Sequence, residues 1–193
     1  KGCPDSDGDG VGDDLDPFKN DPTQFVDTDN DGYGDNPNGT FPDNCPTESG
    51  QSDIGGYGCP DTDRDGYGNN IDKFPADSTQ WNDTDNDGFG DSIIGRNPDS
   101  CPEENGTSTQ GGILGCLDTD GDKWADSIDA FINDPNSWSD NDGDGLSDQG
   151  QDDCPNLEGY SEEPWKGCPD LDGDGIMDLA DDDTDGDGIS DEL

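Results

Sequence analysis

The sequence predicts a chain built mostly of irregular loops, with very little helix or strand and no conventional hydrophobic core. Three observations support this fold class. The formal net charge is -45 on 193 residues, and only 23% of the residues are hydrophobic. Gly, Pro, Asn and Asp interrupt nearly every stretch, which favours turns over long helices or strands. An acidic nine-residue motif recurs in a fixed order along the whole chain.

The motif has the form D-x-D-x-D-G-x-x-D, and its first copy runs from Asp5 to Asp13. Eight copies are present, two of them with one substitution each. A chain of this composition would usually be disordered, because it can bury too little apolar surface to offset its conformational entropy. Disorder predicts no fixed order of residues, however, whereas Asp and Gly recur here in register. We therefore expect the chain to fold when a cation neutralises its carboxylates.

The spacing within the motif favours Ca²⁺ as that cation. Carboxylates at loop positions 1, 3 and 5 point at one centre if the backbone curls around it, and Gly at position 6 permits the sharp turn. The carbonyl of position 7 and the side chains of positions 9 and 12 offer further oxygens. Ca²⁺ prefers roughly 6 to 8 such ligands, whereas Mg²⁺ demands a near-octahedral shell and retains water. We therefore predict about eight or more Ca²⁺ ions, since eight loops are present.

The eight loops, numbered here in chain order, differ in where the last ligand comes from. Loops 1, 3, 5 and 7 have an acid at position 12, and their predicted ligands, with position 7 acting through its carbonyl, are Asp5, Asp7, Asp9, Val11, Asp13 and Asp16; Asp61, Asp63, Asp65, Tyr67, Asn69 and Asp72; Asp118, Asp120, Asp122, Trp124, Asp126 and Asp129; and Asp170, Asp172, Asp174, Ile176, Asp178 and Asp181. In loops 2, 4 and 6 an insertion follows position 9, and the Asp two residues before the next Cys is the candidate for the displaced ligand. Their sets are Asp27, Asp29, Asp31, Tyr33, Asp35 and Asp43; Asp83, Asp85, Asp87, Phe89, Asp91 and Asp99; and Asp140, Asp142, Asp144, Leu146, Asp148 and Asp152. Loop 8 offers Asp183, Asp185, Asp187, Ile189 and Asp191 and has no position 12 before Leu193.

A spacer with an aromatic residue at each end separates the two loops of each long unit. The spacers are 18–25, 74–81 and 131–138, and the step between paired loops is 22 residues in all three units. Position 7 is apolar in all eight loops. Because its carbonyl should face the ion, its side chain should face away, and we expect it to pack on the spacer aromatics.

Loop 5 departs from the pattern at position 6, where Lys123 replaces Gly. A left-handed backbone at this position would cost a non-glycine residue about 1 kcal/mol. We therefore predict that loop 5 is the weakest site among loops 1, 3, 5 and 7.

Cysteines divide the chain 1–193, a single array, into units 2–57, 58–114, 115–166 and 167–193, of which the last is short. Their spacing predicts three sequential disulfides, Cys45–Cys59, Cys101–Cys116 and Cys154–Cys168. Zinc or iron–sulfur ligation is the alternative, but the chain has no C-x-x-C pair. Cys3 is left unpaired within this chain, and its partner would lie upstream or in a neighbouring chain. Disulfides favour an extracellular or cell-surface location.

Composition also excludes several classes of function. Only seven Lys and Arg residues are present, and they are scattered, so we expect no nucleic-acid partner. No apolar run approaches the roughly 20 residues that cross a bilayer. Histidine is absent, which removes His-based triads and His–zinc sites. The carboxylates are better explained as metal ligands than as the acids of a glycosidase, and we predict that the chain is not an enzyme.

Three N-x-[ST] triplets make Asn38, Asn82 and Asn105 candidates for glycosylation, of which Asn82 is the least well placed because it adjoins Asp83. The chain opens within a repeat, at Gly2-Cys3-Pro4, and it therefore looks like a processed form or a segment of a longer, surface-anchored protein.

The chain resembles thrombospondin type 3 repeats over nearly its whole length. The residues that carry the resemblance are paired loops such as 61–66 and 83–88, together with the Cys-Pro-Asp entries at Cys3, Cys59 and Cys168. The spacer is similar to versions in microbial surface proteins. The resemblance implies an elongated chain wound around many Ca²⁺ ions, with little regular structure and with sequential disulfides, in which one Asp can serve two ions. An EF-hand or dockerin would need a helix after the loop, but Pro17 follows Asp16 directly.

These observations favour an extracellular calcium-binding structural protein: a stalk, spacer or filament segment whose folding and rigidity depend on Ca²⁺. The alternative is a cell-surface adhesion module that binds a partner through the loops between units. Head-to-tail self-association is a further expectation, because Cys3 and the incomplete loop 8 lie at opposite ends of the sequence.

Overall fold

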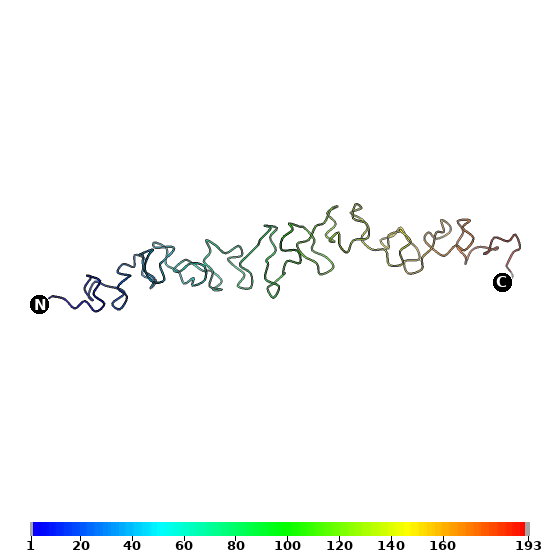
Figure 1. The fold of residues 1–193 in the computed structure, drawn as a ribbon. Helices are drawn as coiled ribbons and strands as arrows, with labels where there is room; N and C mark the ends of the chain where they lie inside the picture. Colours follow the sequence, from blue (N-terminus) through cyan, green and yellow to red (C-terminus); the bar gives the residue numbers. More distant parts are fainter. Residues whose placement is uncertain (1, 192–193) are drawn as a thin grey trace. The chain divides into compact units, whose positions relative to one another are not determined.

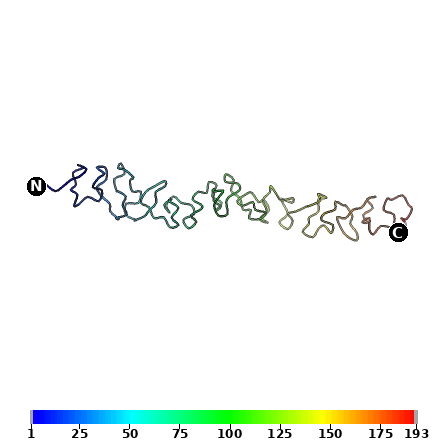
Figure 2. The same ribbon diagram turned by 90° about the horizontal axis from the view of Figure 1, so that it is seen from below.

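The structure is a computed structural model that describes residues 2–191. Within these residues the backbone forms no helix and no extended strand, and both views show a succession of irregular loops (Figures 1 and 2). Its β-structure consists of isolated parallel bridges, which pair Gly34 with Pro42, Asp43 with Tyr57, Ile54 with Tyr67, Gly90 with Pro98, and Glu163 with Ile176. No helix in this part of the chain could cross a membrane. The predicted loop-built fold class is therefore confirmed.

Packing divides the chain into two compact units, Lys1–Pro102 and Glu103–Leu193. Loops 1 to 4 lie in the first unit and loops 5 to 8 in the second. The four sequence units beginning at residues 2, 58, 115 and 167 remain a prediction, because they are defined by repetition of sequence and not by packing.

All eight acidic loops are closed by the same backbone hydrogen bond. The N–H of position 9 donates to the carbonyl of the residue that precedes position 1, as from Asp13 to Pro4 at 2.8 Å and from Asp126 to Leu117 at 2.8 Å. Position 6 is left-handed in every loop, with φ between 82° and 101°. Lys123 shares this conformation at φ 86°, so the condition on which its predicted cost depends is met. Position 4 is left-handed as well, which the sequence analysis missed, and Arg64 adopts φ 66° there.

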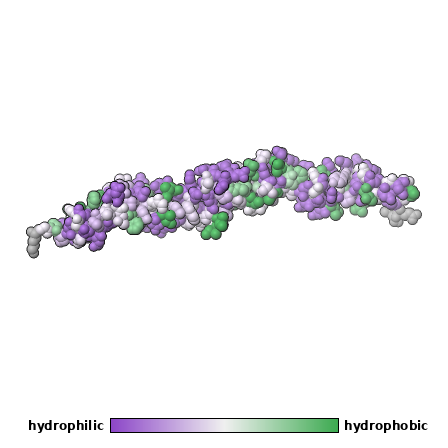
Figure 3. All heavy atoms as spheres, in the orientation of Figure 1, coloured by the Kyte–Doolittle hydropathy of each residue, from purple (hydrophilic) through white to green (hydrophobic). Residues whose placement is uncertain are grey.

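Among the buried side chains, polar and charged ones outnumber hydrophobic ones. Within residues 2–191 the buried hydrophobic residues are Cys59, Cys116, Ala125, Cys168 and Met177. The buried polar and charged residues are Asp16, Gln24, Asp43, Ser52, Asp72, Gln80, Asp99, Ser108, Ser137, Ser147, Asp152 and Ser161. In the space-filling view, hydrophobic residues form small areas set among hydrophilic ones (Figure 3). The loops are therefore held mainly by polar contacts and a few aromatic pairs.

The expected packing of position 7 on the spacer aromatics occurs in loops 3 and 5. The rings of Tyr67 and Trp81 stack with centroids 5.4 Å apart, and those of Trp124 and Trp138 stack at 5.9 Å. Loop 2 differs, because Tyr33 stacks on Tyr57 of the following segment at 5.5 Å.

The structure contains three disulfides, as predicted. Cys45 is bonded to Cys59 and Cys154 to Cys168, while Cys101 and Cys116 are also disulfide-bonded. Cys3 is free and exposed. The segments between paired cysteines contain a repeated Gly-x-Ser triplet, at 50–52, 106–108 and 159–161, that the sequence analysis missed. Each of its serines is buried and accepts the N–H of a cysteine, as Ser52 Oγ accepts that of Cys59 at 2.9 Å.

Replacing Lys123 by Gly should stabilise the chain at saturating Ca²⁺. Relief of the left-handed strain should raise the free energy of unfolding by about 1 kcal/mol, measured by urea denaturation. The reciprocal control is Gly88→Lys in loop 4, where φ is 96° and a side chain would meet no neighbour within 4 Å. This control should lose a similar amount. Equal stability of Lys123→Gly and the unchanged chain would show that Lys123 is not strained.

Candidate metal sites

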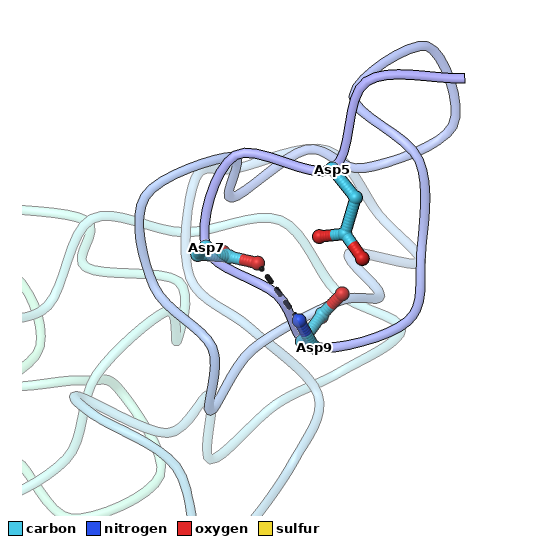
Figure 4. A group of neighbouring side chains, drawn as sticks. All are labelled: Asp5, Asp7 and Asp9. Carbon is cyan, nitrogen blue, oxygen red and sulfur yellow. Dashed lines mark hydrogen bonds between the residues drawn. The ribbon is translucent and has the colours of Figure 1, made fainter. Parts of the chain in front are cut away.

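The carboxylates of positions 1, 3 and 5 converge at the centre of the loops. In loop 1 the side chains of Asp5, Asp7 and Asp9 turn toward one another inside the curl of the backbone (Figure 4). Each of them offers an oxygen that lies within 4.8 Å of the oxygens of the other two. Equivalent groups occur at Asp27, Asp29 and Asp31; Asp61, Asp63 and Asp65; Asp83, Asp85 and Asp87; and Asp118, Asp120 and Asp122, and three more groups of this kind are present.

Backbone N–H groups of the same loop hold these side chains in place. Asp5 accepts the N–H of Gly8 at 2.8 Å with one oxygen and that of Gly10 at 3.2 Å with the other. Asp7 accepts the N–H of Asp9 at 3.2 Å, and Asp9 accepts that of Val11 at 2.7 Å. The bonds from position 6 to position 1 and from position 7 to position 5 recur in all eight loops. The inward orientation is therefore a local consequence of the motif.

Position 12 reaches the same centre through a single turn. In loop 1 the N–H of Asp16 donates to the carbonyl of Gly12, which is position 8, at 3.1 Å. Loops 3, 5 and 7 repeat this bond, from Asp72 to Gly68, from Asp129 to Ala125 and from Asp181 to Met177. One carboxylate oxygen of each Asp then accepts the N–H of the residue two positions further on.

The displaced acids of loops 2, 4 and 6 occupy the equivalent place. The N–H groups of Asp43 and Asp99 donate to the carbonyls of Gly34 and Gly90 at 2.9 Å, and that of Asp152 donates to Ser147 at 3.1 Å. All three acceptors are position 8 of their loops. Each carboxylate accepts the N–H of its cysteine two residues later, at 2.6 to 2.7 Å. The last acid therefore lies in the same place in loops with and without the insertion.

The charges that act on these acids come from their own loops. Burial raises the pKa of Asp43, and the nearby carboxylates of Asp31 and Asp29 raise it further. Burial likewise raises the pKa of Asp99 beside Asp87 and Asp85, and of Asp152 beside Asp144 and Asp142. The structure thus brings each displaced acid together with positions 3 and 5 of its loop.

Position 9 has a structural role in the loop that was not predicted from the sequence. Its side chain closes the loop by accepting the N–H of position 2, as Asp13 accepts that of Ser6 at 2.8 Å. Where position 2 carries a hydroxyl, this often occupies the second oxygen, as between Thr119 Oγ1 and Asp126 at 2.6 Å. The residues of position 9 are Asp13, Asp35, Asn69, Asp91, Asp126, Asp148, Asp178 and Asp191, and a part in ion binding remains a prediction for them. The role of the Ser and Thr residues at position 2 was not predicted from the sequence.

The donor set fits a hard divalent cation. Buried carboxylate oxygens that accept no hydrogen bond within residues 2–191 occur in seven of the eight loops, on Asp7, Asp9, Asp29, Asp43, Asp63, Asp65, Asp72, Asp99, Asp120, Asp122, Asp142, Asp152 and Asp183. In loop 7, Asp172 and Asp174 are exposed instead. The carbonyls of position 7 accept no backbone hydrogen bond in this part of the chain. Buried anionic oxygens without a donor are costly unless a cation compensates them, and the whole chain has only seven Lys and Arg.

No protein-family model and no curated protein matches the chain. The assignment of these loops as metal sites therefore depends on their geometry and on the chemistry of their donors.

The three candidate glycosylation sites are all exposed, and Asn82 also has contacts within its loop. Asn38 is exposed at the insertion of loop 2. The amide of Asn82 donates to Thr84 and Asp91 and so takes part in closing loop 4. Asn105 is exposed.

Acidification should compact the chain when Ca²⁺ has been removed. Burial and like charges raise the pKa of Asp7, Asp29 and Asp63 above 3.8 in the folded form. A raised pKa means that the folded form binds protons more tightly than the unfolded form, so the stability that these three groups contribute is fully present below pH 3.8 and is lost as pH rises through the raised values. In EDTA the hydrodynamic radius should therefore fall between pH 7 and about pH 4. Expansion over this range would contradict the electrostatic argument. Bound Ca²⁺ reverses the sign, because it requires the ionised ligands.

Asp152 and its neighbour Asp153 offer a matched pair for testing the displaced ligand. Asp152 is 6% exposed and has an oxygen without a donor, whereas Asp153 is exposed and accepts the N–H of Lys166. Outer-shell changes in metal sites typically cost about 10- to 100-fold in affinity, and loss of a direct ligand should cost at least as much. Asp152→Asn should therefore remove one Ca²⁺ from the calorimetric titration, and Asp153→Asn should leave the stoichiometry unchanged. An identical effect of the two variants would refute the assignment.

Proposed function

We propose that this chain is an extracellular calcium-binding structural protein, a stalk, spacer or filament segment, whose folding depends on bound Ca²⁺. One observation carries the proposal: buried carboxylate oxygens converge in repeated loops and accept no hydrogen bond within residues 2–191. Binding of the ion would then contribute directly to the free energy of folding, because ligands in the unfolded chain are not assembled. Because the proposal makes these carboxylates metal ligands, it gives them no catalytic role.

The chemistry of the ligands favours Ca²⁺ over other cations. The chain has no histidine, and six of its seven cysteines are disulfide-bonded, so soft and borderline metals lack their usual ligands. Positions 1, 3, 5, 7 and 12 supply at least five protein oxygens in each complete loop. Mg²⁺ is less suited to such a site because it usually keeps several waters. Affinities in the range of extracellular modules, about 10⁻⁴ to 10⁻³ M, would suffice in that setting.

Charge gives the proposal a second support. One Ca²⁺ in each of eight loops adds +16 and changes the formal charge from -45 to -29. Without such ions, repulsion among 52 acidic groups opposes a compact state. The disulfides are typical of oxidising compartments, where Ca²⁺ is also abundant. The resemblance to thrombospondin type 3 repeats is in keeping with this role, and membership of that family is part of the proposal.

One observation favours the alternative role as an adhesion module. The disulfide-closed segment 154–168 exposes three large apolar side chains: Leu157 at 60%, Tyr160 at 65% and Trp165 at 55%. Such side chains could contact a partner surface. This role would use the same calcium-dependent fold, so it adds to the structural proposal and does not replace it.

A titration with Ca²⁺ tests the proposal. In EDTA the chain should be expanded, and Ca²⁺ should reduce its hydrodynamic radius with a midpoint of about 10⁻⁴ to 10⁻³ M. Circular dichroism should change over the same range without developing a helical spectrum, because the described residues form no helix. Mg²⁺ at the same concentrations is the control and should be less effective. No compaction at millimolar Ca²⁺ would defeat the proposal.

A further inference from the structure

Two buried glutamines have contacts that the metal ligands do not explain. Gln24 and Gln80 are the largest fully buried side chains in residues 2–191, each with 1% exposure. Both stand immediately before the aromatic residue that ends a spacer, in corresponding places of the first two long units. Neither belongs to the predicted ligand sets. A buried amide requires hydrogen-bond partners, and these partners show what each glutamine holds.

Each amide joins the two ends of an insertion. Gln24 accepts the N–H of Asn36 at 3.0 Å and donates to the carbonyls of Asn36 and Thr40 at 3.1 Å. Gln80 repeats the arrangement: it accepts the N–H of Ser92 at 2.9 Å and donates to the carbonyls of Ser92 and Arg96 at 3.1 and 3.3 Å. Three hydrogen bonds thus fix the residues where each insertion departs and returns.

The surroundings of each amide are built for it. The threonine before each glutamine adds a bond to the same segment, since Thr23 accepts the N–H of Thr40 and Thr79 that of Arg96, both at 2.8 Å. Glycines line the amide: Gly34 and Gly39 lie against Gln24, and Gly90 and Gly95 lie against Gln80. A Cβ at any of these glycines would overlap the glutamine side chain. The spacer and the insertion therefore fit together closely.

These contacts lie directly upstream of the displaced ligands. Beyond the residues that the glutamines contact, Pro42 forms a β-bridge with Gly34, and Pro98 forms one with Gly90. The next residues in the chain are Asp43 and Asp99. The carbonyl of the same position 8 glycine accepts the N–H of the acid at 2.9 Å. The glutamine thus packs on the residue to which the acid must return.

The third long unit provides an internal comparison. Ser137 stands where the other units have glutamine, and loop 6 reaches Asp152 in 12 residues from Asp140, whereas loop 2 takes 16 from Asp27 to Asp43. In that unit, glutamines of the insertion itself form the hydrogen bonds between the insertion and the spacer. Gln149 accepts the N–H of Trp138 at 2.8 Å, and Gln151 donates to Ser137 Oγ at 3.2 Å. The spacer glutamine is therefore present in the two units whose insertion is four residues longer and absent from the unit with the shorter one.

We infer that Gln24 and Gln80 are positioning residues for the Ca²⁺ sites of loops 2 and 4. The insertions of loops 2 and 4 are four residues longer than that of loop 6, and each glutamine holds one of them closed. Asp43 or Asp99 then returns to the place that position 12 occupies in loops 1, 3, 5 and 7. This inference rests on the proposed calcium-binding function. On this inference, an uncharged side chain in the spacer determines where the last ligand of the loop lies.

The test is hydrogen exchange of the full chain, read by mass spectrometry for each loop across a series of Ca²⁺ concentrations. In Gln80→Ala the Ca²⁺ midpoint for protection of loop 4 should rise about 10- to 100-fold, as for loss of an outer-shell partner. The midpoints of loops 3 and 6 should stay unchanged. Gln51→Ala, which removes an exposed glutamine in the same compact unit, should move no midpoint.

A compensated variant separates positioning from general stability. It combines Gln80→Ser with replacement of residues 92–98 by Gln-Gly-Gln, the sequence found at 149–151. If the glutamine serves the longer insertion, this variant should restore the loop 4 midpoint toward that of the unchanged chain. Failure of restoration, or equal shifts in all loops, would overturn the inference.

The outcomes also separate this inference from the proposed function. A loop 4 midpoint that is the same in Gln80→Ala and Gln51→Ala would overturn the positioning role and leave calcium binding intact. Absence of Ca²⁺-dependent protection in the unchanged chain would overturn the proposed function and, with it, the inference.

Discussion

The rest of the structure depends on one electrostatic constraint, the convergence of like-charged carboxylates inside short loops. Backbone N–H groups satisfy one oxygen of a residue such as Asp9, while its other oxygen is buried and accepts no hydrogen bond within residues 2–191. The loop is thus shaped by its own backbone but not neutralised by it. A divalent cation that takes the remaining oxygens would remove the repulsion, so in the proposed function ions would contribute more to the folding energy than apolar burial.

This constraint also explains how the loops are joined to the disulfides. Asp43 contributes to loop 2, and its carboxylate accepts the N–H of Cys45, whose partner Cys59 donates its N–H to the buried Ser52. The N–H of Gly50, in the segment between the two cysteines, donates to Asp31 of the same loop at 3.0 Å. The covalent closure and the acidic centre therefore share residues, and each restricts the geometry available to the other.

The sequence was sufficient where the signal is local. The spacing of Asp5, Asp7 and Asp9 predicted their convergence, because their orientation depends on hydrogen bonds inside one loop. The equivalence of Asp43 to a position 12 acid followed from its fixed distance to Cys45. The buried Gln24 and Ser52 were missed, because in this chain a polar residue is no indication of exposure. Their signal was present as repetition: glutamine before the last spacer aromatic in two units, and Gly-x-Ser between cysteines in three.

The polar interior sets a limit on what each part can contribute. A satisfied hydrogen bond adds only about 1 kcal/mol to stability, so the amides of Gln24 and Gln80 cannot drive folding by themselves. Leaving such a buried group without its partner costs more than the bond contributes, and this asymmetry makes the amides selective for one path of the insertion. In the proposed function ions would supply the driving force, and buried amides and hydroxyls would choose the geometry in which the ligands meet. A loop that lacks the buried glutamine amide should therefore still bind Ca²⁺, but with lower affinity.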